Sequence, residues 1–384
     1  MGVAGGNSIM GGLFRRLTMA ILRRIVHLVF IVPSFVRLHN PFRTKIISVA
    51  SFAEQPSADY AVVALYPRGG LSRSVRHLIA GLVRNRVNVV LVSNGALAPA
   101  DRTLLSGQVA TLIERENLGR DFGAYQAGIR HLEAEGKLAR CRKLFLINDS
   151  AFYAAPVDRL IADLLGHAAP YIGLFEIFEH HYHVSSFFLC FSQAVAGHPA
   201  FLRFWARYRP YSTRHHVIFA GEGRLTARLM RLNFTPHIVY DTIAIQAALE
   251  QAIDGDPVKC LLDLTMHMPE PWVSPLLGRF TILSGETEPA GSHALARHVI
   301  AAFLREAEGA NQSHALALSA NRLLGAPVLK RDLCYRGFWS IASLLQRIEG
   351  FDEADRAEML LDLRRKGKSP AHLGVGRLLY LIDA

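Results

Sequence analysis

The chain lacks the features that mark several common classes of protein. No acidic residue occurs before Glu54, and only 20% of the 384 residues are charged. Hydrophobic residues make up 51% of the sequence, which is enough for a large core and excludes an intrinsically disordered chain. At about 150 residues per domain, this length indicates one large domain with an appendage, or two domains.

Cysteine is scarce as well. The four residues Cys141, Cys190, Cys260 and Cys334 are scattered, with neither a CxxC pair nor the spacing of a disulfide-rich domain. Each lies in an apolar stretch, which is typical of a buried, reduced thiol. Reduced thiols indicate a reducing compartment, so we expect a cytoplasmic protein.

The amino-terminal segment lacks a hydrophobic run long enough to span a membrane. Between Leu13 and Leu38, the longest stretch without a charged residue covers only the 12 residues 25–36, whereas a spanning helix needs about 20. Arginine pairs at 15–16 and 23–24 interrupt the apolar positions, which argues against a cleaved signal peptide and favours an amphipathic helix lying on a membrane. The alternative is a leader without a role.

Positive charge is concentrated in this leader. The formal net charge is +11, and residues 1–53 hold seven basic and no acidic side chains, which leaves +4 for the rest of the chain. So mild a charge on the body argues against nucleic acid as the partner. The leader is expected to bind an anionic membrane at about 1 kcal/mol per basic residue, which places the protein on the inner face of the cell membrane.

Beyond residue 58, short apolar runs alternate with helical patterns. The expected strands are 60–66, 87–92, 109–113, 143–147 and 171–178, and the expected helices are 72–84, 121–138 and 157–165. Apolar runs separated by amphipathic helices predict parallel strands that are buried on both faces. The predicted fold class is therefore α/β, with a doubly wound sheet and helices on both faces.

The pattern changes after the Pro-Glu-Pro sequence at 269–271. Further helices are expected at 292–308, 312–324, 337–348 and 352–366, with glycine or proline breaks between them. The predicted organisation is a basic leader over 1–53, an α/β domain over 54–270 and a mainly helical region over 271–384.

Polar residues follow the predicted strands, and ligands of doubly wound sheets bind at the carboxyl ends of the strands. Each polar group alone could form an ordinary turn. Their accumulation at one edge predicts a binding site. Its candidates are Tyr66, Asn94, Asn117, Gly119, Arg120, Asp121, Asn148, Asp149, Ser150 and His183.

The segment 116–125 leaves a strand and opens a helix. Asp121 is the predicted N-cap, and the free N–H groups of a helix terminus favour an anion such as a diphosphate. Arg120 adds a donor fork that suits phosphate, and Gly119 and Gly123 allow close backbone approach. An ordinary capped helix would explain Asp121 but neither Arg120 nor the two glycines.

A carboxylate follows the strand at 143–147. Asp149 lies between Asn148 and Ser150, where it could hold Mg²⁺ or Mn²⁺ bridging the phosphates of a nucleotide. The alternative is a capping turn before the next helix.

Several motifs occur together in this order along the chain. They are Asn117-x-Gly-Arg-Asp-Phe-Gly-Ala-Tyr125, Phe145-Leu-Ile-Asn-Asp-Ser150, His183-x-x-Ser-Phe-Phe188, Phe201-x-x-Phe-Trp205 and Gly325-Ala-Pro-Val-Leu-Lys330. This combination resembles the rhamnan synthesis protein F family, glycosyltransferases of cell-surface polysaccharide and lipopolysaccharide assembly. The resemblance covers roughly residues 58–335.

The resemblance implies a nucleotide-sugar-binding fold of the GT-A type. By similarity to inverting GT-A transferases, Asn148 and Ser150 take the two aspartate positions of an Asp-x-Asp motif. The metal site would then be rebuilt around Asp149 or absent. The implied reaction is transfer of a sugar, L-rhamnose from a dTDP donor, to a lipid-linked or polysaccharide acceptor.

A candidate base lies at the start of a later helix. Residues 221–229 are similar to the Glu-Asp motif that supplies the base in those enzymes, and Glu222 is the carboxylate that remains. An inverting transfer needs one carboxylate to deprotonate the acceptor hydroxyl. Asp241 is the reserve candidate. The alternative is that Glu222 only caps a basic helix.

The histidines at 180, 181 and 183 do not have the spacing of a zinc site, because neighbouring residues of a strand point to opposite faces and neither cysteine nor carboxylate accompanies them. We expect His183 to contact the acceptor or the diphosphate, or simply to line the pocket. The motifs leave a second function open, that of a non-catalytic scaffold with the same fold in a polysaccharide-assembly complex.

Overall fold

The computed structural model describes residues 31–40, 45–67, 69–179, 181–256, 259–260, 289–335 and 341–366. Most of the predicted amphipathic leader lies outside these residues, and its described part is a helical segment over residues 31–39. Within the described ranges, no helix is both long and apolar enough to cross a membrane.

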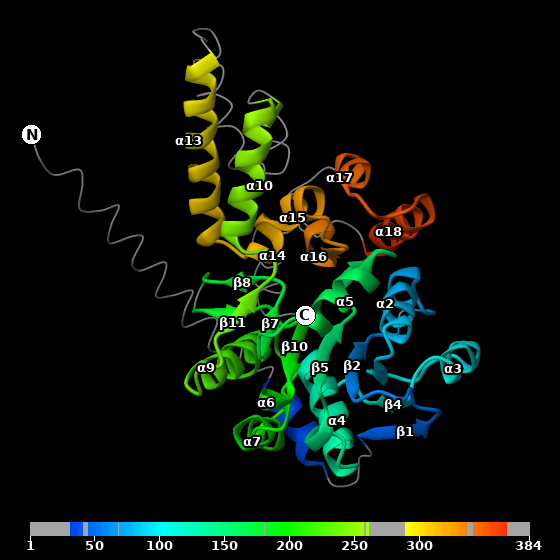
Figure 1. Cartoon of the computed structure of the whole chain (residues 1–384). Helices are drawn as coiled ribbons and strands as arrows, with labels where there is room; N and C mark the ends of the chain where they lie inside the picture. The colour runs from blue at the N-terminus through cyan, green and yellow to red at the C-terminus, as the bar shows by residue number, and fades with distance from the viewer. Residues whose placement is uncertain are drawn as a thin grey trace, which may run out of the picture.

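An eight-stranded sheet forms the centre of the molecule (Figure 1). In spatial order its strands are β1 (Ile46–Ser51), β4 (Thr111–Arg115), β3 (Asn88–Ser93), β2 (Asp59–Leu65), β5 (Lys143–Asn148), β10 (Phe188–Ser192), β7 (Tyr171–Gly173) and β11 (Pro236–Ile238). The adjacent strands β4, β3, β2 and β5 are parallel, as predicted. Strand β1 runs antiparallel to β4, and β10 runs antiparallel to β5 and β7, so the whole sheet is mixed.

Helices cover both faces of this sheet. Successive residues of β2 point to opposite sides, so Val63 packs with α2 (Arg73–Arg84) and α5 (Val157–Gly166) in one core, whereas Val62 packs with α4 (Arg120–Ala134), α7 (Pro199–Arg207) and α9 (Arg224–Met230) in the other. This arrangement confirms a mixed α/β fold with a large central sheet.

Two boundaries differ from the sequence prediction. The sheet begins with β1 at residue 46, inside the segment predicted as leader. The sequence did not predict this edge strand, because it is largely exposed and carries no buried apolar run. The expected strand 171–178 is divided into β7 and β8 (Glu176–Ile177), and β8 pairs with β9 (His183–Val184). The remaining short helices of this part are α3 (Pro99–Ser106), α6 (Gln193–Ala196) and α8 (Arg214–His216).

The carboxy-terminal helices share a core with the sheet. Helices α10 (Thr242–Gly255) and α13 (Pro289–Glu308) lie side by side beyond the sheet (Figure 1), and their buried residues Leu249, Val299 and Phe303 belong to the same apolar cluster as Val63. Further helices are α14 (Gln312–Ala315), α15 (Ala317–Leu324), α16 (Arg331–Tyr335), α17 (Ile341–Arg347) and α18 (Glu353–Lys366). The predicted domain boundary near 270 lies outside the described residues.

One short strand of this region reaches back to the sheet. Strand β12 (Val328–Lys330) pairs antiparallel with β6 (Ala151–Tyr153), which directly follows β5, and Lys330 lies opposite Ala151. The carboxy-terminal part therefore contributes residues to the edge of the sheet where the predicted site lies.

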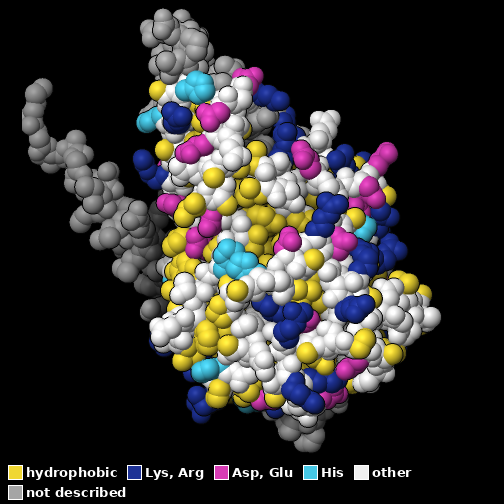
Figure 2. Space-filling view, in the orientation of Figure 1, with side chains coloured by type: hydrophobic (Ala, Val, Ile, Leu, Met, Phe, Trp, Pro, Cys, Tyr) yellow, Lys and Arg dark blue, Asp and Glu magenta, His cyan; other side chains and the backbone are white. Residues whose placement is uncertain are grey.

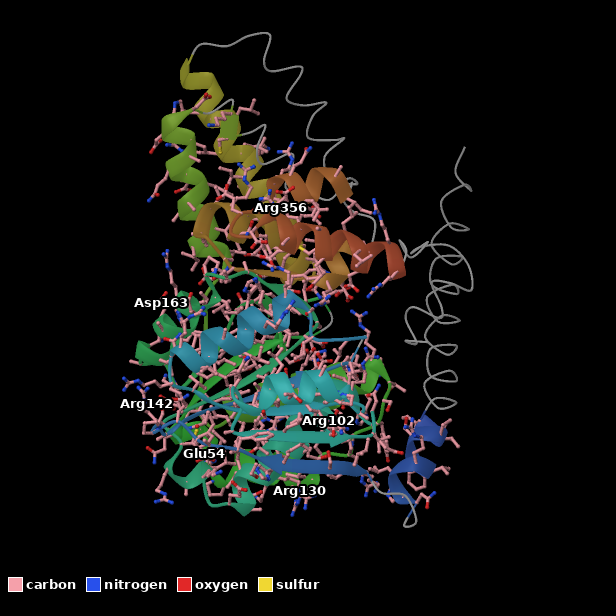
Figure 3. The ribbon with its side chains drawn as sticks, turned by 90° about the vertical axis from the view of Figure 1, so that its right-hand side faces the viewer. Glu54, Arg102, Arg130, Arg142, Asp163 and Arg356 are labelled. Atoms are coloured by element: carbon pink, nitrogen blue, oxygen red, sulfur yellow. The ribbon has the colours of Figure 1, made fainter. Side chains whose placement is uncertain are left out.

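The two ends of the parallel strands are readily distinguished. Figure 3 shows Arg142, which precedes β5, and Glu54 on the opposite side of the sheet from helix 31–39. At the carboxyl ends, Arg37 of this helix donates to the Asn117 carbonyl at 3.5 Å. Figure 2 shows basic and acidic side chains interspersed on one face, in keeping with a body that is only mildly basic.

Candidate active site

The loop between β4 and α4 is shaped by glycine. Gly119 has φ +78°, and a Cβ at this position would lie 2.1 Å from the Pro210 Cβ and 2.6 Å from its Cα. A Cβ at Gly123 would lie 2.1 Å from the Leu118 carbonyl oxygen. Gly119 is the N-cap of α4, whereas Asp121 lies inside its first turn, so the predicted N-cap was wrong by two residues. A left-handed backbone at the cap favours glycine, which explains the shift.

Arg115 holds this loop in place. Its buried guanidinium donates to Asn94 Oδ1 at 2.5 Å and to the Leu118 carbonyl at 2.6 Å. Asn94 in turn donates to the Arg120 carbonyl at 3.4 Å. Burial lowers the pKa of Arg115 to about 10, so it stays charged at neutral pH. The predicted residue Asn94 is thus part of the loop's support.

Tyr66 joins two of the predicted residues. Its hydroxyl donates to Asn117 Oδ1 at 3.2 Å, and its backbone N–H donates to Asp149 Oδ2 at 3.2 Å. Burial raises the pKa of Tyr66, so the phenol is a neutral donor. Three strand ends are therefore connected through this residue, as the topology of the sheet predicted.

A second chain of hydrogen bonds runs from α4 to β12. Asn148 Nδ2 donates to Asp121 Oδ2 at 2.9 Å, and Asn148 Oδ1 accepts from the Ser150 N–H at 2.9 Å. Ser150 Oγ accepts from Lys330 Nζ at 2.8 Å. Burial raises the pKa of Asp121, while the nearby charges of Arg120 and Lys330 oppose that rise.

Lys330 is the residue that the sequence did not assign to the site, although it ends one of the family-like motifs. Burial lowers its pKa, while the charges of Asp332, Glu222 and Asp121 raise it. Its ammonium lies 4.5 Å from the centre of the Phe187 ring. Strand β12, which carries it, is fixed by the next residue, Arg331, whose Nε donates to the Asp149 carbonyl at 2.8 Å.

The residues around Asp149 do not fit a divalent metal. Asp149 is buried, and its Oδ2 accepts a hydrogen bond from the Tyr66 N–H. The Asn148 amide donates to Asp121, and the Ser150 hydroxyl oxygen accepts a hydrogen bond from Lys330. Magnesium demands near-octahedral oxygen ligands, and an ammonium beside Ser150 would repel it. In the described part of the chain, no three His, Cys, Asp or Glu side chains are grouped to hold a metal ion.

Glu222 lies in a π-helical turn, Val217–Gly223, just before α9. Its Oε1 accepts from both the backbone N–H, at 3.2 Å, and the hydroxyl of Ser186. Its Oε2 lies 3.4 Å from His183 Nε2. The carboxylate is thus bound by His183 of β9 and by Ser186 of the β9–β10 loop, and the N-cap of α9 is Gly223, so Glu222 does not merely cap a helix.

The charges of this pair stabilise each other. Burial alone would raise the pKa of Glu222, but the bonds from His183 and Ser186 lower it overall. Burial alone would lower the pKa of His183, but Glu222 raises it overall. The second ring nitrogen, His183 Nδ1, lies 2.9 Å from the His181 carbonyl.

Asp241, the reserve base, has another role. It is the N-cap of α10, where its Oδ1 accepts from the Ala244 N–H at 2.7 Å. An aspartate with a β-region backbone before a helix is a preferred cap. We therefore withdraw Asp241 as a candidate base.

The site thus combines groups of opposite charge from distant parts of the chain. We call Asp121, Glu222 and Lys330 the charged cluster, because the charge of Lys330 acts to lower the pKa of both carboxylates and their charges act to raise the pKa of Lys330. Acid–base sites typically shift the pKa values of two neighbouring carboxyl groups in opposite directions. Of the cluster, the sequence identified Asp121 and Glu222.

Two comparisons with known proteins show limited similarity. The chain is 30% identical over 183 residues to the uncharacterized protein y4gN of Sinorhizobium fredii, a match that covers 46% of this chain and about half, 47%, of that relative. Among solved structures, it is similar to the mannosyltransferase PcManGT of Pyrobaculum calidifontis, in complex with GDP-mannose and Mn²⁺, with a TM-score of 0.25, 12% identity and coverage of 47% of this chain and 56% of that one.

The third comparison concerns families. Residues 89–266 span β3 to α10 and include all the charged cluster except Lys330. This segment matches the family model of rhamnan synthesis protein F, which confirms the resemblance predicted from the motifs.

Proposed function

We propose that this protein is a glycosyltransferase of cell-surface polysaccharide or lipopolysaccharide synthesis. The observation that carries the proposal is the charged cluster, in which the charge of Lys330 acts to lower the pKa of a largely buried Glu222, and a chain of hydrogen bonds joins Lys330 to Asp121 through Ser150 and Asn148. The family match over 89–266 supports the same interpretation.

In this proposal the donor is a nucleotide diphosphate sugar with a GT-A type of binding. Its diphosphate lies at the β4–α4 loop, where Arg120, the first residue of α4, offers a guanidinium fork that suits phosphate oxygens. The ammonium of Lys330 supplies positive charge at the leaving group, at the edge of the sheet where Ser150 follows β5. We retain L-rhamnose from dTDP as the proposed sugar.

The chemistry is a single displacement. The acceptor hydroxyl oxygen bonds to the anomeric carbon, the bond from that carbon to the diphosphate breaks, and its electron pair leaves with the diphosphate. Glu222 takes the proton of the acceptor hydroxyl. Ser186 and His183 keep the carboxylate ionised and oriented before the acceptor arrives.

The test is nucleotide release from a panel of donors, including dTDP-L-rhamnose, UDP-glucose and GDP-mannose, with bacterial membrane extract as the acceptor source. We expect release from one donor, dTDP-L-rhamnose in the first place, that requires the acceptor. Because Lys330 supplies the charge, release should continue in EDTA and fall at least about 100-fold in Lys330→Met, as the loss of a transition-state donor does.

Two results would contradict parts of this account. Activity that EDTA abolishes and Mn²⁺ restores would overturn the role of Lys330. No release of nucleotide from any donor would favour the non-catalytic scaffold. The presence of a single carboxylate at the Asp-x-Asp position is also consistent with a scaffold.

A further inference from the structure

A cavity lies next to the charged cluster. Its volume is about 780 Å³, and its walls are α7, the loop after it, the π-helical turn and α9. Gly223, which lines it, follows Glu222 directly, and a Cβ there would lie 2.1 Å from His181 Nε2. The His181 ring, also in the wall, stacks at 4.9 Å on His183, the partner of Glu222.

The cavity carries charge of one sign, which is positive. Arg207, Arg209, Arg224, Arg228 and Arg231 line it, and no Asp or Glu does. Within the described ranges, none of these five arginines forms an ion pair with a carboxylate; the contact found is from Arg228 Nη1 to the Ala200 carbonyl at 3.5 Å.

Three of these arginines share one face of α9. Arg224, Arg228 and Arg231 recur at the helical spacing of four and three residues, an arrangement in which like charges destabilise a helix by about 0.2–0.5 kcal/mol per pair. Five guanidinium groups around one cavity repel one another, and an anion between them would remove that repulsion. Guanidinium forks match phosphate oxygens in pairs.

Aromatic residues form the rest of the wall. Phe204, Tyr208, Tyr211 and Phe219 line the cavity. Tyr208 is 7% exposed, and its hydroxyl has no hydrogen-bond partner among the described residues, which is an uncommon state for a buried donor.

We infer that this cavity binds the phosphate-bearing part of the acceptor, with Arg224 and Arg228 on its phosphate oxygens. The inference rests on the proposed function, because it places the acceptor beside Glu222. Helix 31–39 lies near this cavity, because the N–H of Ser212, in the loop that forms part of its wall, donates to Ser34 Oγ at 3.3 Å. An apolar chain attached to the phosphate could therefore continue along this helix. On that helix Val32, Phe35 and Val36 are 60%, 45% and 59% exposed.

The test measures binding rather than turnover. Inorganic pyrophosphate is titrated by calorimetry into the full chain, the Arg224→Gln/Arg228→Gln variant and a control, Arg130→Gln/Arg203→Gln, which removes two exposed arginines of α4 and α7 that do not line the cavity. We expect at least tenfold weaker binding in the first variant and a change below twofold in the control.

A third variant, Lys330→Gln, separates this cavity from the donor edge. Pyrophosphate binding that is unchanged in the Arg224→Gln/Arg228→Gln variant, or that is lost only in Lys330→Gln, would overturn the inference. Because no donor is present, an enzymatically inactive chain can still pass the test, so failure of the proposed function remains distinguishable.

The source of the phosphate is resolved by a second titration with geranyl diphosphate. Tighter binding than that of pyrophosphate, lost in the Arg224→Gln/Arg228→Gln variant, supports the inference with a lipid-linked phosphate. Equal affinities, again lost in that variant, support it with a soluble phosphate-bearing acceptor. Tighter binding that survives in the variant contradicts it, because the prenyl chain alone would then account for the affinity.

Discussion

Glu222 owes its ionised state to two neighbours. Burial disfavours a carboxylate charge, yet hydrogen bonds from Ser186 and the nearby imidazolium of His183 outweigh burial and lower the pKa of Glu222. A base must be unprotonated to act, and Glu222 meets this condition throughout the neutral range. Burial raises the pKa of Asp121, and its carboxylate already accepts from Asn148 Nδ2 and from the Phe122 N–H.

Replacing His183 by glutamine tests this pair. The folded pKa of His183 lies above its ordinary value of 6.5, so its stabilising effect is complete below pH 6.5 and disappears as the pH rises through the raised pKa. The pKa of Glu222 lies below its ordinary value of 4.5, so its effect disappears as the pH falls through the lowered pKa. The pair therefore stabilises most between these two ordinary values.

Urea unfolding of wild type and His183→Gln at a series of pH values measures the effect. We expect a loss of about 1–3 kcal/mol near pH 6 and a smaller loss at pH 9. A loss that is the same at both pH values would show that His183 acts through packing and not through its charge.

Gly119 provides a second residue-scale prediction. Alanine there meets a positive φ and the backbone of Pro210, so Gly119→Ala should lower the free energy of unfolding by about 2–4 kcal/mol. Gly136 is a matched control, because its φ is +68° but a Cβ added there would have no atom within 4 Å. Urea unfolding of both variants separates the clash from the backbone cost, and equal losses would contradict the close approach.

At the scale of elements, the strand β12 is the part that completes the site. Arg331 anchors it through the Asp149 carbonyl and through an ion pair with Asp362 at 2.7 Å. Its guanidinium also lies 4.0 Å from the centre of the Phe152 ring. The position of Lys330 therefore depends on contacts between segments that are about 180 residues apart in the sequence.

We predict that Arg331→Met destabilises the fold by about 2–4 kcal/mol, because it removes a buried guanidinium that donates to the Asp149 carbonyl and pairs with Asp362. Arg322→Met is the control, since the Arg322–Glu349 pair at 3.6 Å is on the surface, where such pairs contribute about 0–1 kcal/mol. Chemical denaturation of both variants gives the comparison. A larger loss for Arg322→Met would contradict the anchoring role of Arg331.

The sequence predicted the elements whose periodicity is local. Strands β2, β3, β4 and β5 and helices α2, α4 and α5 were expected within a few residues of their observed bounds. Strand β10 was not among the predicted strands, and its antiparallel direction was not foreseen. Strand β12 was not predicted either, since three residues carry no period and its partner β6 is remote.

For the site, too, local motifs predicted residues, whereas contacts between distant segments were not predicted. Asp149, His183 and Glu222 were predicted from strand ends and motifs. In the structure Asp149 accepts from the Tyr66 N–H, and Glu222 lies against His183 and Ser186. Arg115 was not predicted to support the site, because it is the last residue of the buried strand β4 and was taken as part of that strand. The last residue of the motif Gly325–Lys330 was the available signal for Lys330, but only the fold shows what it contacts.

At the scale of the molecule, the charge of +11 is divided between a basic leader and a body of +4. Exposed apolar residues of helix 31–39 lie on the same side as the site. We propose on this basis that the leader brings the active site to an anionic membrane, where a lipid-linked acceptor would be available.

Deleting residues 1–30 removes Arg15, Arg16, Arg23 and Arg24. At about 1 kcal/mol for each basic residue, binding to vesicles that contain phosphatidylserine should fall by at least about 100-fold, while the urea stability of the body changes by less than about 0.5 kcal/mol. Vesicle sedimentation at low and high salt measures the binding. A truncated chain that sediments as wild type does would contradict the membrane role.

The measurement that tests the central claim most directly is sugar transfer by Glu222→Gln. Glutamine keeps the shape of the side chain but is not a base, so we predict that kcat falls by about 100-fold or more while the affinity for the nucleoside diphosphate changes less than about threefold. Thermal unfolding confirms that the variant is folded. Transfer at the wild-type rate by a folded Glu222→Gln chain would contradict the assignment of this site.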